Sequence, residues 1–435
     1  MTGDSTRLHG SARGRTGLRV TDVRVTQVAV KDPPLLNSIG VHEPFALRAV
    51  IEVYAGPDLL GLGEAYGDDP SVARLRRVAP ALVGLDPFDL PELHRRTATA
   101  LGEAPDYMPT DMIGPPSASK TLAATFAAFE LPCLDLAGQA IGRPVGDLLG
   151  GAVRSAVPFS GYLFYRWAAH PGQPADGLGE ALTPNGIVAQ AKHLVDRYGF
   201  GSLKLKGGVR PPDEEIAAIR ALREAFPEHP LRLDPNANWS VPTSIRVGTE
   251  LTGVLEYLED PTDGLAGMAE VARAVPMPLA TNMCVTTFGD LPAAIEQGSV
   301  QVVLSDHHYW GGLRESVILA GVCRTFGLDL SMHSNTHLGI SLAAMTHLAA
   351  CVPNLGYACD THIPWQVEDV IEPGVLRFVD GSVPVPTSPG LGVTLDRDAL
   401  ARLHEQYLTC GIRRRDDVGY MRSIDPSWAG TRPRF

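Results

Sequence analysis

The sequence predicts a parallel β/α barrel joined to a smaller α+β domain, and three observations carry this expectation. Seven short apolar runs each end in a polar residue, at intervals of 23 to 28 residues. An interval of that size fits one strand plus one crossover helix. The chain has 435 residues, more than the roughly 250 that a barrel needs. The residues before the first of these runs read as consecutive strands followed by helices, which predicts a separate α+β unit.

The seven runs are SLKLK, LRLDPN, LEYLEDP, PLATNM, VVLSD, DLSMHS and YACD. Their polar ends are Lys206, Asp234, Glu259, Asn282, Asp306, His333 and Asp360. Because the carboxyl ends of parallel strands meet at one rim of a barrel, we expect these side chains to face one pocket.

Residues 18–155 are expected to form the small α+β domain. The runs LRVTDVRVTQVAV, FALRAVIEVYA and LLGLGEAYG are rich in β-branched residues and are separated by turn residues, which predicts an antiparallel meander. Helical patterns follow over 71–105 and 119–148, the second with Gly142 as a stop. Pro132 lies inside the second pattern and should kink or break the helix.

Residues 156–365 are expected to form the barrel. The strand-like run VPFSGYLFY precedes a Gly- and Pro-rich stretch at 170–186, which we expect to be a surface insertion. Later strands alternate with helical patterns such as DEEIAAIRALREAF, as in successive βαβ units. The last block, 366–435, loses this rhythm and is expected to return to the first domain. Residues 1–17 read as a disordered tail.

Composition and charge restrict the class of protein. A net charge of −12 argues against a nucleic-acid-binding surface, because phosphate contacts need basic clusters. No run approaches about 18 consecutive apolar residues, so no membrane span is expected. The six cysteines show no CxxC pair or disulfide spacing, and residues 1–17 lack the apolar core of a signal peptide. We therefore expect a cytoplasmic protein.

Asp234, Glu259 and Asn282 offer three oxygen ligands at consecutive strand ends. Such a set suits a hard cation such as Mg²⁺. Taken singly, each residue could instead cap the N-terminus of a helix. Their succession at the spacing of one strand plus one helix, between a lysine pair and a histidine, favours the metal.

Lys204 and Lys206 lie two residues apart on one strand and therefore point the same way, into the barrel mouth. Two ammonium groups beside a cation lower each other's proton affinity, so one can act as a neutral base. The alternative is that both bind an anion without chemistry. His333 follows the sixth run, and Asp306, one strand earlier, could fix its tautomer. A structural role is the alternative for this histidine.

The chemistry that uses such a set is proton abstraction next to a carboxylate. A cation with a lysine beside it stabilises the ene-diolate that develops. Bases on opposite faces could take a proton from either configuration, and protonated His333 could help an adjacent hydroxyl leave as water. His307 and His308 are expected only to pack the rim, and Asp360 has no assigned role.

The chain resembles the enolase superfamily, and within it the glucarate dehydratase group, over roughly residues 25–435. The specific elements are LLNSIGVHEPF, SGYLFY, LKLKGG, LDPNANW, LEDP, ATNM, LSDHHYW, MHSNTHLGISLA and DTHIPWQ. Asn282 is the sharpest, because the resemblance implies an amide where most of the superfamily has a carboxylate. It also implies a TIM-like (β/α)7β barrel with an α+β N-terminal capping domain completed by the C-terminal segment.

The resemblance implies a hydro-lyase that uses Mg²⁺ to convert D-glucarate, and L-idarate, to 5-dehydro-4-deoxy-D-glucarate. His333 would be the base toward D-glucarate and Lys206 the base toward the epimeric L-idarate. Lys204 and Asn236 would hold the reacting carboxylate, with Asp306 as the partner of His333. Substrate contacts would come from Asn37, His42, Tyr162, Ser334, Asn335, His362 and Arg432.

The implied partner is a small diacid sugar, with no nucleic acid or membrane partner and with a homo-oligomer expected. One alternative keeps the site and changes the outcome: a dehydratase or epimerase of another aldarate or hydroxy acid. Another is a non-catalytic binding relative, which would lack a base or a metal ligand, and neither is missing. The sequence departs from the family pattern at PPSASK, after LEDP, at the N-terminus and at 170–186.

Overall fold

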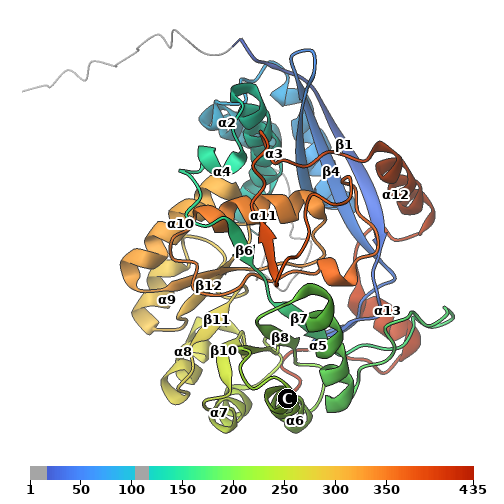
Figure 1. The fold of residues 1–435 in the computed structure, drawn as a ribbon, viewed down its shortest axis with the longest axis vertical. Coiled ribbons are helices and arrows are strands. Elements are labelled where there is room, and N and C mark those ends of the chain that lie inside the picture. Colours follow the sequence, from blue (N-terminus) through green and yellow to red (C-terminus); the bar gives the residue numbers. More distant parts are fainter. Residues whose placement is uncertain (1–16, 103–116) are drawn as a thin grey trace, which may run out of the picture.

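The structure, a computed structural model, describes residues 17–102 and 117–435. The predicted tail at 1–17 therefore lies outside the described residues except for Gly17, as do the end of the pattern at 71–105 and the start of PPSASK. Figure 1 shows two parts, an N-terminal sheet with its helices and a ring of strands and helices below it.

The first part is built on a three-stranded antiparallel sheet, whose strands in spatial order are β1 (Val20–Lys31), β4 (Phe45–Ala55) and β5 (Leu59–Tyr66). The predicted meander is therefore confirmed. The central strand β4 is almost entirely buried, as its β-branched residues require. Between β1 and β4 the chain forms a short hairpin of β2 (Leu36–Asn37) and β3 (Gly40–Val41).

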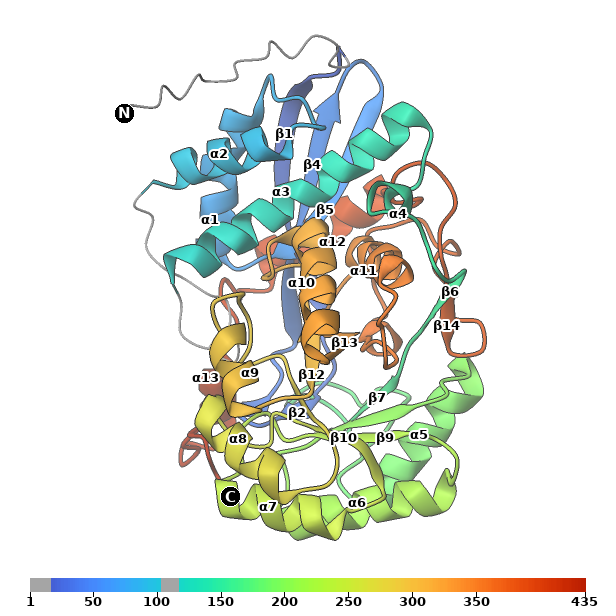
Figure 2. The same ribbon diagram turned by 90° about the vertical axis from the view of Figure 1, so that its left-hand side faces the viewer.

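Helices cover this sheet on one side (Figure 2). They are α1 (Asp69–Val78), the 3-10 helix η1 (Ala79–Leu82), α2 (Leu90–Leu101) and α3 (Ala118–Ile141), and the short helix α4 (Val145–Leu148) packs against α3. The pattern at 71–105 is divided, because Asp89 starts a new helix: its side chain accepts the backbone N–H of Glu92.

Helix α3 runs through Pro132 without a break, so one of the two outcomes expected for this proline is wrong. The helix packs along β5, where a Cβ at Gly61 would lie 2.1 Å from the Pro132 carbonyl oxygen. This close packing stabilises the helix despite the hydrogen bond that proline cannot make. The helix is long and apolar enough to cross a membrane, but 83% of its most apolar window is buried inside the protein.

The second part contains seven parallel strands in sequence order: β7 (Gly161–Phe164), β8 (Leu203–Lys206), β9 (Leu231–Asp234), β10 (Leu255–Glu259), β11 (Leu279–Thr281), β12 (Val302–Ser305) and β13 (Asp329–Met332). The helices that follow them are α5 (Pro184–Tyr198), α6 (Pro212–Ala225), α7 (Val241–Glu250), α8 (Gly264–Ala274), α9 (Leu291–Gln297), α10 (Gly312–Phe326) and α11 (Gly339–Cys351). The predicted parallel β/α architecture is confirmed.

The run that ends in Asp360 is not a regular strand, contrary to expectation, but it closes the ring. Its backbone forms parallel bridges from Leu355 to Leu330 on β13 and from Cys359 to Phe159 before β7. Each neighbour supplies only one bridge, which is too few for a continuous ladder.

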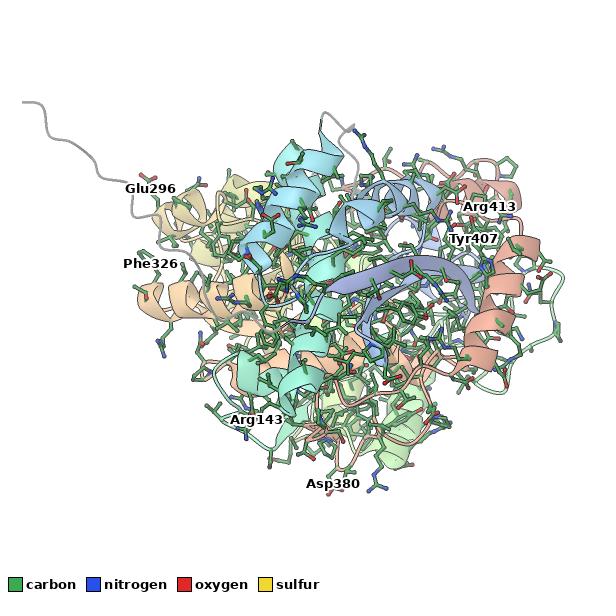
Figure 3. The ribbon with its side chains drawn as sticks, turned by 90° about the horizontal axis from the view of Figure 1, so that it is seen from above. Arg143, Glu296, Phe326, Asp380, Tyr407 and Arg413 are labelled. Carbon is green, nitrogen blue, oxygen red and sulfur yellow. The ribbon has the colours of Figure 1, made fainter. Side chains whose placement is uncertain are left out.

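The C-terminal segment contacts both parts. Its strand β14 (Ser382–Pro384) pairs with β6 (Ala156–Pro158), and α12 (Arg397–Thr409) packs against β1. The Arg413 guanidinium stacks on the Tyr407 ring at 4.6 Å beside α12 (Figure 3). Helix α13 (Asp417–Ile424) packs against β3, and the last residues bind the backbone of Asn238. The segment thus completes the first part and reaches the rim of the second.

Glu130 of α3 joins the two parts. Its carboxylate accepts the backbone N–H groups of Leu313 and Arg314 in the first turn of α10. A Cβ at Gly312 would lie 1.9 Å from a Glu130 oxygen, so glycine is needed there. Burial raises the pKa of Glu130 to about 7.

This pKa predicts a pH-dependent stability. Because it lies above the ordinary value of 4.5, the contribution of Glu130 is fully present below pH 4.5 and is lost as the pH rises through about 7. Relative to Glu130→Gln, the wild-type unfolding free energy should fall over this window by on the order of 3 kcal/mol. Urea unfolding at several pH values measures this, with exposed Glu224→Gln as control. Parallel profiles for wild type and Glu130→Gln would contradict the expectation.

Candidate active site

The predicted strand-end residues converge on the carboxyl ends of the parallel strands. Asp234 and Glu259 end β9 and β10, and Asn282, Asp306 and His333 follow β11, β12 and β13 directly. All are buried except His333, whose side chain is 12% exposed. The strand ends therefore carry titratable groups that are shielded from water.

Lys204 lies among three carboxylates. Its Nζ is 2.6 Å from Glu259 Oε2, 2.7 Å from Asp360 Oδ2 and 3.4 Å from Asp234 Oδ2. Burial alone would lower the pKa of Lys204, but the charges of Asp360 and Glu259 outweigh it and hold the pKa well above its ordinary value. Lys204 is therefore held as an ammonium, and the assignment of the neutral base to Lys206 stays a prediction.

Lys206 points to the same side of β8 as Lys204. The Nζ atom of Lys206 lies 5.9 Å from the centre of the Tyr162 ring, and that of Lys204 lies 4.6 Å from it. Lys206 Nζ donates to Asp234 Oδ2 and to Asn236 Oδ1, both at 2.7 Å. Asn236 has a φ of 56°, a left-handed conformation that the surrounding structure must hold in place.

Asp234, Glu259 and Asn282 fit a Mg²⁺ site. Among the described residues, buried Glu259 Oε1 and Asn282 Oδ1 have no hydrogen-bond donor, which costs free energy that a cation would recover. Burial and the nearby charge of Asp234 raise the pKa of Glu259 well above its usual value, and a divalent cation would reverse that shift.

The alternative reading of these three residues as helix caps fails. The helices that follow β9, β10 and β11 have their N-caps at Ser240, Asp263 and Asp290. Within 17–102 and 117–435, no backbone N–H at a helix N-terminus donates to the side chain of Asp234, Glu259 or Asn282. Asp260, which sequence reasoning missed although it stands in LEDP, instead accepts the Asn282 backbone N–H and the Thr281 hydroxyl, and so orients the loop that presents the amide.

His333 and Asp306 are brought together. His333 Nδ1 lies 2.9 Å from Asp306 Oδ2, and the other carboxylate oxygen lies 2.8 Å from His308 Nδ1. Burial alone would raise the pKa of Asp306, but its contacts with His308, His337 and His333 hold it well below its usual range. Because an ionised carboxylate only accepts, Nδ1 of His333 carries the proton and Nε2 is the basic nitrogen.

Tyr162, His362 and His42 form an aromatic wall around Phe164. The Tyr162 hydroxyl donates to Asp234 Oδ2 at 3.0 Å. The His362 ring lies 5.0 Å from that of Tyr162, and the His42 ring lies 6.1 Å from that of Phe164. Burial lowers the pKa of His362 well below its ordinary value, so this wall presents a neutral imidazole.

The other predicted substrate contacts have varied surroundings. Asn37 Oδ1 accepts the N–H groups of Ile39 and Gly40, and its Nδ2 donates to Asp417, so its amide organises the β2–β3 turn. The Ser334 hydroxyl donates to the Asn335 carbonyl, and Asn335 Nδ2 donates to the Tyr66 hydroxyl. Arg432 Nη1 lies 3.4 Å from the Asn236 carbonyl oxygen, which brings it to the rim. Contact of these residues with a substrate stays a prediction.

Comparisons with known proteins agree with this geometry. The family of enolase C-terminal domain-like proteins matches residues 186–399. The chain is 53% identical to a probable glucarate dehydratase of Streptomyces coelicolor, over 94% of this chain and 97% of that protein. It is 25% identical to a D-xylonate dehydratase of Haloferax volcanii, over 89% and 90%.

Solved structures are similar over nearly the whole chain. An enolase from Mycobacterium smegmatis complexed with tartrate has a TM-score of 0.93 at 60% identity, covering 98% of this chain and 100% of that one. An enolase from Thermobispora bispora complexed with magnesium and formate has a TM-score of 0.94 at 60% identity, covering 96% and 100%.

Proposed function

Because the chain belongs to the enolase superfamily, we propose that it is a Mg²⁺-dependent dehydratase of D-glucarate and its epimer L-idarate, forming 5-dehydro-4-deoxy-D-glucarate. One observation carries the proposal: two candidate bases, Lys206 and His333, stand at separate strand ends of one rim that also carries three oxygen ligands. The 53% identity to a probable glucarate dehydratase supports the choice of substrate.

Binding of the substrate would use the charges at the strand ends. Held by Asp234, Glu259 and Asn282, Mg²⁺ would supply positive charge that stabilises the reacting carboxylate as it becomes an ene-diolate. Lys204, kept protonated by its carboxylate neighbours, and Asn236 would hold the same carboxylate. The amide at Asn282 carries no negative charge, which makes the site more favourable for a doubly charged diacid.

His333 would then transfer the proton of D-glucarate. Its Nε2 takes the C5 proton of D-glucarate, and the electron pair moves into the carboxylate. The protonated ring returns the proton to the C4 hydroxyl, which leaves as water, and the enol becomes the 5-keto product. Toward L-idarate, whose C5 configuration is inverted, Lys206 in its neutral form takes the proton from the other face.

A substrate panel tests the proposal. The purified protein with Mg²⁺ is screened against mono- and diacid sugars, with formation of a 2-keto acid as the readout. We expect turnover of D-glucarate and L-idarate and none of monoacids. If no diacid is dehydrated, the proposal is wrong.

A second candidate keeps the site and changes the product. Two bases that approach one carbon from opposite faces could also epimerise a hydroxy acid or act on another aldarate. Exchange of the α-proton with deuterium without loss of water would favour that reaction over dehydration.

A homo-oligomer and a cytoplasmic location belong to the same proposal. All six cysteines are free thiols, which fits a reducing compartment. Light scattering on the purified protein measures the oligomeric state.

The metal site gives a separate prediction. Asn282→Ala should weaken Mg²⁺ binding at least about tenfold, because an oxygen ligand is lost. Asn282→Asp should keep the metal and raise the KM for a diacid, because it adds a negative charge. Calorimetric titration with Mg²⁺ and steady-state kinetics measure the two effects. Unchanged Mg²⁺ affinity in Asn282→Ala would show that Asn282 is not a ligand of the metal.

A further inference from the structure

We infer that Arg48, on strand β4 of the N-terminal sheet, is a positioning residue for the base His333. By keeping His308 neutral, it leaves Asp306 with the negative charge that holds the Nδ1 proton of His333 and stabilises the ring once Nε2 has taken a proton. The inference deepens the proposed function, on which its kinetic test rests, whereas its spectroscopic test is independent of any substrate.

A continuous line of buried polar contacts joins the two parts of the protein. Arg48 Nη2 lies 3.0 Å from His308 Nε2, and His308 Nδ1 lies 2.8 Å from Asp306 Oδ1. The other oxygen of Asp306 lies 2.9 Å from His333 Nδ1. Arg48 is 2% exposed, His308 4% and Asp306 1%, so water does not compete for these contacts.

The proton positions follow from what each group can do. A guanidinium has donors and no acceptor, so His308 Nε2 must accept from Arg48 and carry a lone pair. His308 is then neutral with its proton on Nδ1, and that N–H donates to Asp306 Oδ1. The backbone N–H of His308 donates to the same oxygen at 2.9 Å. Oδ2 is left to accept from His333 Nδ1, and Nε2 of His333 becomes the base.

Glu64 holds Arg48 in place. Its Oε1 accepts from Arg48 Nε at 2.7 Å. The two Glu64 oxygens also accept the N–H groups of Leu338 and Ser341 at 2.9 Å each. These residues lie at the start of α11, the helix that comes after β13 and His333 in the chain. The pair Arg48–Glu64 therefore aligns both the ring of His308 and the segment that carries the base.

A buried ion pair that only stabilises the fold would not need this geometry. Arg48 gives Nε to Glu64 and turns Nη2 to His308, while the Ser341 hydroxyl lies 3.0 Å from the same His308 nitrogen. Two donors thus converge on one nitrogen and exclude a proton from it. Arg48 belongs to the N-terminal sheet. His308 is therefore held neutral, and Asp306 keeps its charge for His333, only when that sheet packs against the barrel.

The kinetic test compares two substrates in one variant. Arg48→Met should lower kcat for D-glucarate at least about tenfold, because His308 can then take a proton on Nε2 and neutralise the charge with which Asp306 supports His333. It should leave α-proton exchange on L-idarate, which uses Lys206, within about twofold. Arg48→Lys, which keeps a group that only donates, should recover part of the D-glucarate activity. Arg397→Met removes an ion pair to Glu52 on the same strand and should change neither rate.

The spectroscopic test uses ¹⁵N-histidine NMR of the protein without substrate. Wild type should show His308 and His333 as neutral rings protonated on Nδ1, and Arg48→Met should show His308 protonated on both nitrogens while His333 keeps its Nδ1 proton. A His308 ring that stays neutral in a folded Arg48→Met, or equal loss on both substrates, would overturn the inference. If no diacid reacts at all, the proposed function fails and the NMR result alone decides this one.

A second pair of variants covers the case in which Arg48→Met does not fold. His308→Leu removes the donor to Asp306 and should lower D-glucarate turnover while sparing L-idarate exchange. His308→Asn, whose amide nitrogen occupies the position of Nδ1, should retain more of that turnover. Equal turnover of D-glucarate in His308→Leu and wild type would overturn the inference.

Discussion

Replacing His333 by Asn should abolish turnover of D-glucarate while α-proton exchange on L-idarate continues. The variant removes the basic Nε2 that takes the C5 proton of D-glucarate, and loss of a general base costs about 10²- to 10⁴-fold. Lys206, on β8, is untouched by the change. The measurement is product formation from D-glucarate, together with deuterium exchange into L-idarate followed by NMR.

The reciprocal variant is the control for this result. Lys206→Met should stop exchange on L-idarate and retain more of the D-glucarate reaction, although it also removes a hydrogen bond to Asp234. Equal loss on both substrates in His333→Asn would contradict the assignment of one base to each epimer.

Replacing Lys204 by Met is expected to lower the free energy of unfolding strongly. Its ammonium is fully buried and contacts Glu259, Asp360 and Asp234. Removing one partner of a buried ion pair costs about 3–5 kcal/mol, because the charges that remain are uncompensated. Urea unfolding without Mg²⁺ should show this loss, and added Mg²⁺ should restore part of it by binding the same carboxylates.

A double variant separates charge from packing in this experiment. Lys204→Met combined with Asp360→Asn removes one carboxylate as well, so it should be more stable than Lys204→Met alone. If Lys204→Met has the same urea midpoint of unfolding as wild type, the ammonium of Lys204 does not stabilise the carboxylates around it.

The strand ends of the barrel could be predicted because a parallel strand and its helix repeat at a regular interval. Lys206, Asp234 and Glu259 end their strands as expected, since apolar runs buried on both faces are easy to read. The helix cap that divides 71–105 at Asp89 was not anticipated, because a capping residue in a polar stretch is a weak signal.

The electrostatics of the site were less predictable, because they depend on residues far apart in the chain. Lys204 and Asp360 are separated by 156 residues, and only their 2.7 Å contact shows that Lys204 is held as a cation. His308 was expected only to pack the rim, since nothing in LSDHHYW indicates that Arg48 from another sheet reaches it. Pro132 behaved as a helix residue because glycines on β5 let α3 pack closely.

The fate of the C5 proton of D-glucarate tests the account most directly. Wild-type protein is incubated with D-glucarate and Mg²⁺ in D₂O, and ¹H NMR follows the substrate and the product. The account predicts that the C5 signal disappears as 5-dehydro-4-deoxy-D-glucarate accumulates, and that a chelator stops both. If the protein binds Mg²⁺ and yet neither D-glucarate nor L-idarate loses its C5 proton, the account is contradicted.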